Sequence, residues 1–178
     1  MKRINTRFIT MTGMLLALTI VFQVIGRFFI TPLMGPNNNF VVGPLVNACL
    51  LIATASVGLL GGTIIAILAP FGALITGAGV PPLFVPFIAI GNFLIVFCFH
   101  LLKRNRIAGL IVGSIIKFAF LFAAINVFVS LMELPTKKAN LFVFAFGWPQ
   151  LVTAIIGGII AIAVLKSLDK SFQNNENI

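Results

Sequence analysis

The chain has 178 residues, of which 60% are hydrophobic and only 8% are charged, and its formal net charge is +9. A soluble domain has about 25% charged residues, and a soluble fold of this composition would have to expose a large apolar surface to water. The composition therefore excludes a soluble domain and predicts a protein of the lipid bilayer. The basic residues form short clusters between apolar segments, without the interleaved aromatic residues of a nucleic-acid site, so nucleic-acid binding is not expected.

Long apolar segments predict an all-α, polytopic membrane protein. A span needs about 20 mostly apolar residues. Four segments satisfy this separately, and a fifth, longer run is either one buried helix or two spans joined by a turn. The four segments cover residues 8–30, 82–102, 107–131 and 141–165, and the longer run covers residues 40–76.

The positions of the basic residues decide the number of spans, because cytoplasmic loops carry an excess of Lys and Arg. If the long run is two spans, most of the basic residues face the cytoplasm: Lys2, Arg3, Arg7, Lys103, Arg104, Arg106, Lys166 and Lys170. If it is one span, the cluster at 103–106 faces outward. Glycines at 58, 61 and 62 supply backbone freedom for the turn. We therefore predict six spans with cytoplasmic N- and C-termini, in one domain of residues 1–170 followed by a polar tail, 171–178.

Three polar side chains on the last three predicted helices fall at one depth. Asn92, Lys117 and Gln150 each lie nine or ten residues inside their helix, about 14–15 Å at 1.5 Å per residue. The acidic residues of the chain all lie in loops or the tail: Glu133, Asp169 and Glu176. A buried ammonium without a protein counter-ion favours an anionic or strongly accepting ligand. The alternative for Lys117 is a structural lysine that bonds helix backbone or extends toward the cytoplasmic interface.

Other polar or aromatic residues near the outer ends of the helices are further candidates for ligand contact. Arg27 either extends to the outer interface or stands at the rim of a pocket. Trp148 is either an interfacial belt residue or a stacking wall. Additional amide groups occur near the outer end of the second helix and in the first outer connection: Asn47, Asn37, Asn38 and Asn39. The two proline- and glycine-rich outer connections, 31–43 and 77–82, are either ordinary tight links or the rim of an outward-facing pocket.

The chain lacks the residue patterns of enzymes and metal sites. One histidine and three peripheral acids provide no catalytic triad, paired carboxylates or metal cluster, and no Gly-Lys-Ser/Thr phosphate loop is present. No catalytic activity, cofactor or metal is therefore expected. Energy for any uphill transport has to come from a partner protein.

Four short motifs give the chain a family resemblance that covers roughly residues 10–165. They are Gly43-Pro44-Leu45-Val46-Asn47, Gly58-Leu59-Leu60-Gly61-Gly62, Pro81-Pro82-Leu83-Phe84-Val85-Pro86-Phe87 followed by Gly91-Asn92, and Gly147-Trp148-Pro149-Gln150. With these motifs the chain resembles the S components of energy-coupling-factor (ECF) transporters. These are small six-helix subunits that capture vitamins in bacterial cell membranes.

The resemblance implies a mechanism, a set of partners and a location. An S component binds a vitamin or precursor from outside, in a pocket formed by helices four to six and capped by the first outer connection. It then associates with a membrane T component and two cytoplasmic ATPases, and tilts to deliver the ligand. The T component docks on a small-residue face of helix one, which Gly13 and Ala17 match here, with glycine replacing the first alanine.

The substrate and two other classes of function remain open at this stage. Lys117 favours a carboxylate-bearing, pantothenate-like ligand first, and a hydroxymethylpyrimidine- or pyridoxine-like ligand second. One alternative is a non-catalytic membrane scaffold of the morphogenesis type, in which Lys117 pairs with a partner helix. The other is a passive small-molecule facilitator, which requires a continuous polar stripe that the second and third helices lack.

Overall fold

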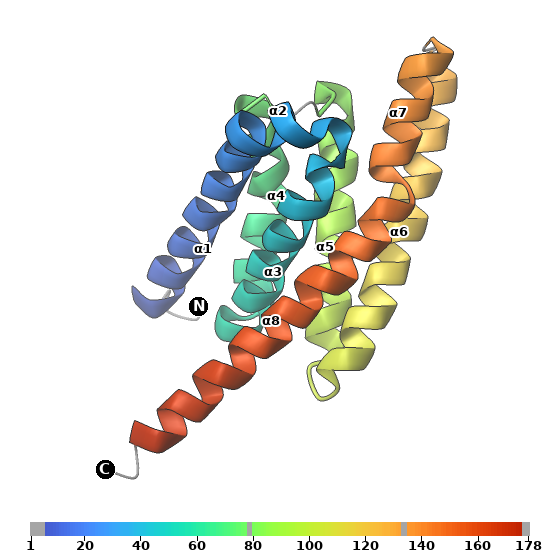
Figure 1. Ribbon diagram of the computed structural model, residues 1–178. Coiled ribbons are helices and arrows are strands. Elements are labelled where there is room, and N and C mark those ends of the chain that lie inside the picture. The colour runs from blue at the N-terminus through green and yellow to red at the C-terminus, as the bar shows by residue number, and fades with distance from the viewer. Residues whose placement is uncertain (1–5, 78–79, 133–134, 176–178) are drawn as a thin grey trace.

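Helices dominate the computed structural model, which describes residues 6–77, 80–132 and 135–175. Within these residues no strand occurs, so the predicted all-α fold is confirmed. The long helices form a bundle, and most of the shorter elements lie at one end of it (Figure 1). In chain order the elements are α1 (Thr6–Ile25), the π-helix η1 (Gly26–Ile30), α2 (Thr31–Met34), the 3-10 helix η2 (Gly35–Asn38), α3 (Asn39–Val57), α4 (Leu59–Ile75), the 3-10 helix η3 (Pro82–Phe84), α5 (Val85–Leu101), α6 (Arg106–Leu131), α7 (Thr136–Phe146) and α8 (Trp148–Asn175).

The lengths and outer surfaces of the helices fit a lipid environment. Five helical stretches of the described residues are long and apolar enough to cross a bilayer. One further apolar helix, α4, is shorter, with 17 residues. Its length is about 26 Å, whereas the hydrocarbon core is about 30 Å thick. Large apolar side chains such as Ile9 and Ile75 point away from the bundle, with exposed fractions of 61% and 85%. The chain is therefore a multi-pass membrane protein.

Helix α3 lies at the centre of the bundle. Among the long helices it alone has no large apolar side chain that is mostly exposed, and it packs against α1, α4, α5 and α8. Its contact with α8 is close, because Gly157 of α8 faces the backbone of α3 at Pro44 and Ala48. Gly113 of α6 similarly faces the backbone of α5 at Ile95. Gly113 and Gly157 therefore allow close packing between helices inside the bundle.

The long apolar run folds as two helices, as the charge pattern predicted. The turn consists of Gly58 between α3 and α4, with φ +88°, a left-handed conformation that favours glycine. Gly61 and Gly62 do not belong to this turn but lie inside α4. A side chain at Gly62 would collide with Thr54 of α3, so this glycine allows the two helices to pack closely.

The first outer connection, 31–43, does not have the irregular backbone that its proline and glycine residues suggested. The segment is helical throughout, as α2, η2 and the first turn of α3. Pro32 is the second residue of α2, where a missing N–H costs nothing. Gly35, the first residue of η2, has φ +56° and changes the chain direction between α2 and η2. The second outer connection is described only at Gly77 and from Val80 onward.

The sixth predicted span, 141–165, is not one continuous helix. It is interrupted at Gly147, whose backbone leaves the helical region at φ −88° and ψ −130°. Pro149 has no N–H to donate to the carbonyl of Ala145 four residues earlier, so a continuous helix would leave that carbonyl unpaired. The break produces α7 and α8, and α7 runs alongside α6 at the edge of the bundle (Figure 1).

The beginning of α1 and the end of α8 lie at the same end of the bundle (Figure 1). This arrangement agrees with an even number of spans, while the cytoplasmic location of that end remains a prediction. Helix α8 extends to Asn175, so the first five residues of the predicted polar tail belong to the helix. Lys2, Arg3, Glu133 and the tail residues 176–178 lie outside the described residues.

Candidate functional site

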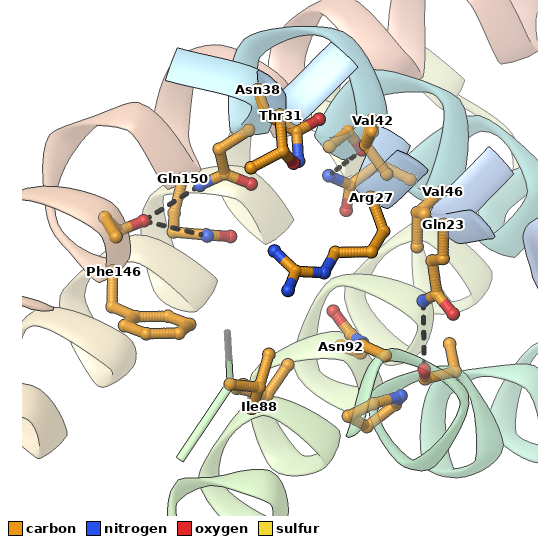
Figure 2. A pocket seen from close by; sticks show the side chains of 18 of the residues that line it. Gln23, Arg27, Thr31, Asn38, Val42, Val46, Ile88, Asn92, Phe146 and Gln150 are labelled. Atoms are coloured by element: carbon orange, nitrogen blue, oxygen red, sulfur yellow. Dashed lines mark hydrogen bonds between the residues drawn. The ribbon is translucent and has the colours of Figure 1, made fainter. Parts of the chain in front are cut away.

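A cavity of about 470 Å³ opens in the half of the bundle that contains α2 and α7. This volume falls within the roughly 300–1,000 Å³ of small-molecule sites. Figure 2 shows polar side chains from several elements around it. Its walls are Gln23, Arg27, Thr31, Gly35, Asn38, Asn39, Val42, Gly43, Val46, Asn47, Ala69, Pro70, Ala73, Val80, Ile88, Asn92, Lys117, Leu141, Phe142, Ala145, Phe146 and Gln150. The walls thus come from α1, α3 and α4 as well as from the later helices that the family resemblance implied.

Lys117 of α6 is buried in this wall and joins three helices. Its exposed fraction is 2%, and its Nζ donates to Asn47 Oδ1 at 2.7 Å and to Asn92 Oδ1 at 2.8 Å. Both amides are buried as well, and each donates its own Nδ2 to a backbone carbonyl. An ammonium group has three N–H donors, so one remains after these two bonds. We refer to Lys117, Asn47 and Asn92 as the amide–lysine cluster.

Asn47 reaches the cluster from a position about two turns inside α3. The sequence placed Asn47 near the outer end of the second helix, but α3 begins at Asn39. Asn47 is therefore eight residues, about 12 Å, inside the helix. The expected closeness of Asn92 and Lys117 is seen as a direct hydrogen bond. Gln150 lines the same cavity but bonds to the carbonyl of Ala145 at 3.2 Å instead of joining the cluster.

Two side chains of the cavity bond backbone carbonyls of α4, and one of them, Asn92, compensates for a proline in that helix. Pro70 of α4 has no N–H for the carbonyl of Ala66, and Asn92 Nδ2 lies 3.5 Å from that oxygen. Gln23 Nε2 donates to a different carbonyl of α4, Ala69 O, at 2.9 Å, and so ties α1 to α4. The substitution of a side-chain donor for a lost backbone donor, as at Asn92, is what allows proline inside a membrane helix.

The wall formed by α7 is held by a second, similar arrangement. The carbonyl of Ala145 lacks its usual helical donor because of Pro149. Asn39 Nδ2 donates to this oxygen at 2.9 Å, and Gln150 Nε2 donates to it at 3.2 Å (Figure 2). Two amides from different helices thus fix the end of α7 against α3 and α8. Phe146 closes the wall and packs edge-on against Phe84, with 4.7 Å between the ring centroids.

Seven of the nine predicted substrate-binding residues line the cavity, and two do not. The seven are Arg27, Asn38, Asn39, Asn47, Asn92, Lys117 and Gln150. Trp148 is 52% exposed and packs against Phe40 and Phe144, outside the cavity wall. Asn37 is exposed and also stands outside the wall. The ligand-binding role of each of the seven remains a prediction.

Several cavity residues were not among the predicted contacts. Gln23 lies one turn before Arg27 on α1, and a lone glutamine in an apolar helix is the signal that identifies it. Thr31 donates to Gly26 O at 2.9 Å, and its Oγ1 accepts from Asn38 Nδ2 at 2.8 Å, within η1, α2 and η2. Phe142 and Phe146 give no such signal, because the chain contains 19 phenylalanines.

The predicted docking residues lie on the outer surface of α1. Gly13 and Ala17 are both exposed. An added side-chain carbon at Gly13 would meet no atom within 4 Å. This face is therefore not used for packing within the bundle, and its role in docking remains a prediction.

Comparison with known proteins gives one family match. A family model described as "ECF transporter, substrate-specific component" matches residues 7–168. No curated protein and no solved structure matches the chain.

Proposed function

This chain belongs to the family of ECF transporter substrate-specific components, and from this premise we propose that it binds a water-soluble vitamin or vitamin precursor in the cavity around Lys117. The observation that carries the proposal is the amide–lysine cluster at the cavity wall. Burying an ammonium in an apolar bundle is costly. Two buried asparagines, Asn47 and Asn92, accept hydrogen bonds from the Lys117 ammonium and orient it. In the described part of the chain no acidic side chain lines the cavity. The remaining N–H is free for a ligand acceptor.

The composition of the cavity wall supports a small ligand with both polar and apolar parts. Val42, Val46 and Ile88 form apolar surface between the polar groups, and Phe142 and Phe146 add aromatic surface. The absence of an acidic side chain from this wall disfavours a cationic ligand. A pantothenate-like anion is our first choice, and a neutral hydroxymethylpyrimidine- or pyridoxine-like molecule is our second.

We further propose that an ATPase-driven partner module completes transport. The chain has no phosphate-binding loop of its own. The partners would be a membrane T component and two cytoplasmic ATPases, and the setting would be a bacterial cell membrane. The exposed small-residue face of α1 at Gly13 and Ala17 offers a flat surface on which another membrane helix can pack closely.

A thermal-shift screen of the detergent-purified protein against water-soluble vitamins and their precursors tests ligand capture. A ligand at one hundred times its Kd stabilises the folded state by about 2.7 kcal/mol. For a chain of this size that corresponds to about 5–11 °C in Tm. We expect one compound, or one group of related compounds, to give such a shift.

Two variants of α5 form a matched control for the location of the site. Ile88 lines the cavity, whereas Ile90, two residues later, is 45% exposed on the outside of the bundle. Ile88→Trp should fill the cavity and remove the ligand-induced shift, and Ile90→Trp should retain it. A folded wild-type protein that responds to no compound would contradict capture, and loss of the shift in both variants would contradict this location.

A further inference from the structure

Arg27 is a second cation of the cavity, and its surroundings differ from those of Lys117. It lies in the π-helical segment η1, which continues α1, and its side chain lines the cavity. Figure 2 shows the guanidinium extending into the space between Gln150 and Phe146 on one side and Asn92 on the other. The side chain thus points into the cavity instead of extending along the outer interface.

Arg27 stands in a π turn that packs closely against α3. The Thr31 N–H and its side-chain hydroxyl both donate to Gly26 O, which closes a five-residue π turn. Gly26 packs directly against Val42 of α3, so a side chain at this position would collide and α1 lies close to α3 there. Single π turns of this kind occur often at functional sites.

The two cations of the cavity differ in the number of N–H donors that they have left for a ligand. Lys117 already donates to Asn47 and Asn92, so it has one N–H left in a buried position. Arg27, by contrast, makes no hydrogen bond or ion pair with any residue that the structure describes, and its side chain is exposed. It therefore has five N–H donors in a planar fork, the geometry that binds a carboxylate or phosphate with two parallel bonds.

We propose that Arg27 binds the anionic group of the ligand and that the amide–lysine cluster binds a neutral acceptor at the ligand's other end. This inference rests on the proposed capture function and specifies its substrate class. The anion stays at the more exposed cation, where its desolvation costs less than beside buried Lys117. The middle of the ligand lies against Val42, Val46 and Ile88. The substrate is thus an elongated molecule with an anion at one end and a carbonyl, hydroxyl or ring nitrogen at the other.

Matched pairs of an anionic and a neutral compound test this assignment. The probes are pantothenate with panthenol, nicotinate with nicotinamide, and pyridoxine 5′-phosphate with pyridoxine. The first two pairs report on a carboxylate and the third on a phosphate. Kd is measured by titration calorimetry for the wild type, Arg27→Gln, Arg27→Lys and, as the control for loss of positive charge, Lys137→Gln. Lys137 is an exposed residue of α7 outside the cavity wall.

We expect the anionic member of one pair to bind at least tenfold more tightly than its neutral partner. Arg27→Gln should weaken binding of the anionic member by about 10- to 100-fold, which is about 1.4–2.8 kcal/mol. It should change the Kd of the neutral member by less than threefold. Arg27→Lys should restore part of the affinity, and Lys137→Gln should leave it unchanged. Because Arg27 has no bond to a described residue, Arg27→Gln should also keep the wild-type Tm without ligand.

Three results would overturn the assignment in distinguishable ways. If the neutral member binds as tightly as the anion, or if Arg27→Gln leaves anion affinity unchanged, the inference fails while capture stands. If Arg27→Gln weakens both members equally, Arg27 supports the fold of the site and not the anion. If no compound binds to the folded wild type, the proposed capture function itself fails, and the inference fails with it.

Discussion

The amide–lysine cluster predicts an unusual dependence of one mutation on another. Asn47→Leu alone removes one of the two acceptors of the Lys117 ammonium, and hydrogen bonds to charged groups contribute about 1.5–3 kcal/mol. Lys117→Met removes the donor and leaves two buried amide oxygens, on Asn47 and Asn92, without a partner. At about 1–3 kcal/mol for each unsatisfied group, this costs about 2–6 kcal/mol.

Combining the two substitutions should reverse the sign of the Asn47 effect. In the Lys117→Met background the Asn47 oxygen is already unpaired, so Asn47→Leu removes a penalty and should raise the free energy of unfolding by about 1–3 kcal/mol. The Asn47 amide nitrogen bonds only Gly43 O of its own helix at 2.9 Å. Its loss therefore orphans no distant group.

The assay is reversible unfolding of the ligand-free protein in detergent for the wild type, the two single variants and the double variant. For a chain of this length, 1 kcal/mol corresponds to about 2–4 °C in Tm, so Lys117→Met should lower Tm by at least about 4 °C. Asn126→Leu is the control, because Asn126 is exposed on the same helix and bonds only Phe122 O. The reasoning is refuted if Asn47→Leu has the same effect in both backgrounds within about 0.5 kcal/mol, the limit of additivity for independent sites.

Three further predictions concern helix contacts. Gly157→Ala should destabilise the fold by about 1–3 kcal/mol, because the added carbon collides with the α3 backbone, whereas Gly13→Ala should be neutral in the same unfolding assay. Gly13→Leu should block co-purification with a T component and leave ligand affinity unchanged; normal assembly would exclude this face as the dock. Asn39→Leu and Gln150→Leu should each have a small effect on protease cleavage of α7, and together a larger one than their sum, because either amide alone still pairs with the Ala145 carbonyl.

The membrane fold could be predicted from the sequence because a bilayer imposes a simple length and polarity rule. A span requires a long apolar segment, and basic residues mark the cytoplasmic connections. These rules divided the run 40–76 into α3 and α4, and the glycine with positive φ is at the predicted turn, Gly58. The proximity of Asn92 and Lys117 followed from depth alone, because both helices are nearly uninterrupted between their ends and these residues.

The same rules failed where proline and glycine lie inside or beside helices. Residues 31–43 have the composition of a loop, yet Pro32 falls at the start of a short helix, where proline is tolerated. The hydropathy pattern does not reveal the break at Gly147, because the residues on both sides are similarly apolar. Pro149 was the available signal, because it removes a backbone donor wherever a helix would otherwise continue.

Proline also explains why depth did not suffice to assign the polar side chains. Asn92 is tied to the carbonyl that Pro70 leaves without a helical donor, and Gln150 to the carbonyl that Pro149 leaves unpaired. Each therefore has a structural task that reduces its capacity to bind a ligand. Lys117 is largely committed to its two amides. Of the two cavity cations, Arg27 thus keeps more N–H donors that no described residue uses, and Lys117 keeps one N–H. The side-chain oxygens of Gln23 and Asn38 in the same wall are also without a partner among the described residues. A ligand that matches this distribution needs a strong acceptor at the exposed end of the cavity and a weaker one at the buried end.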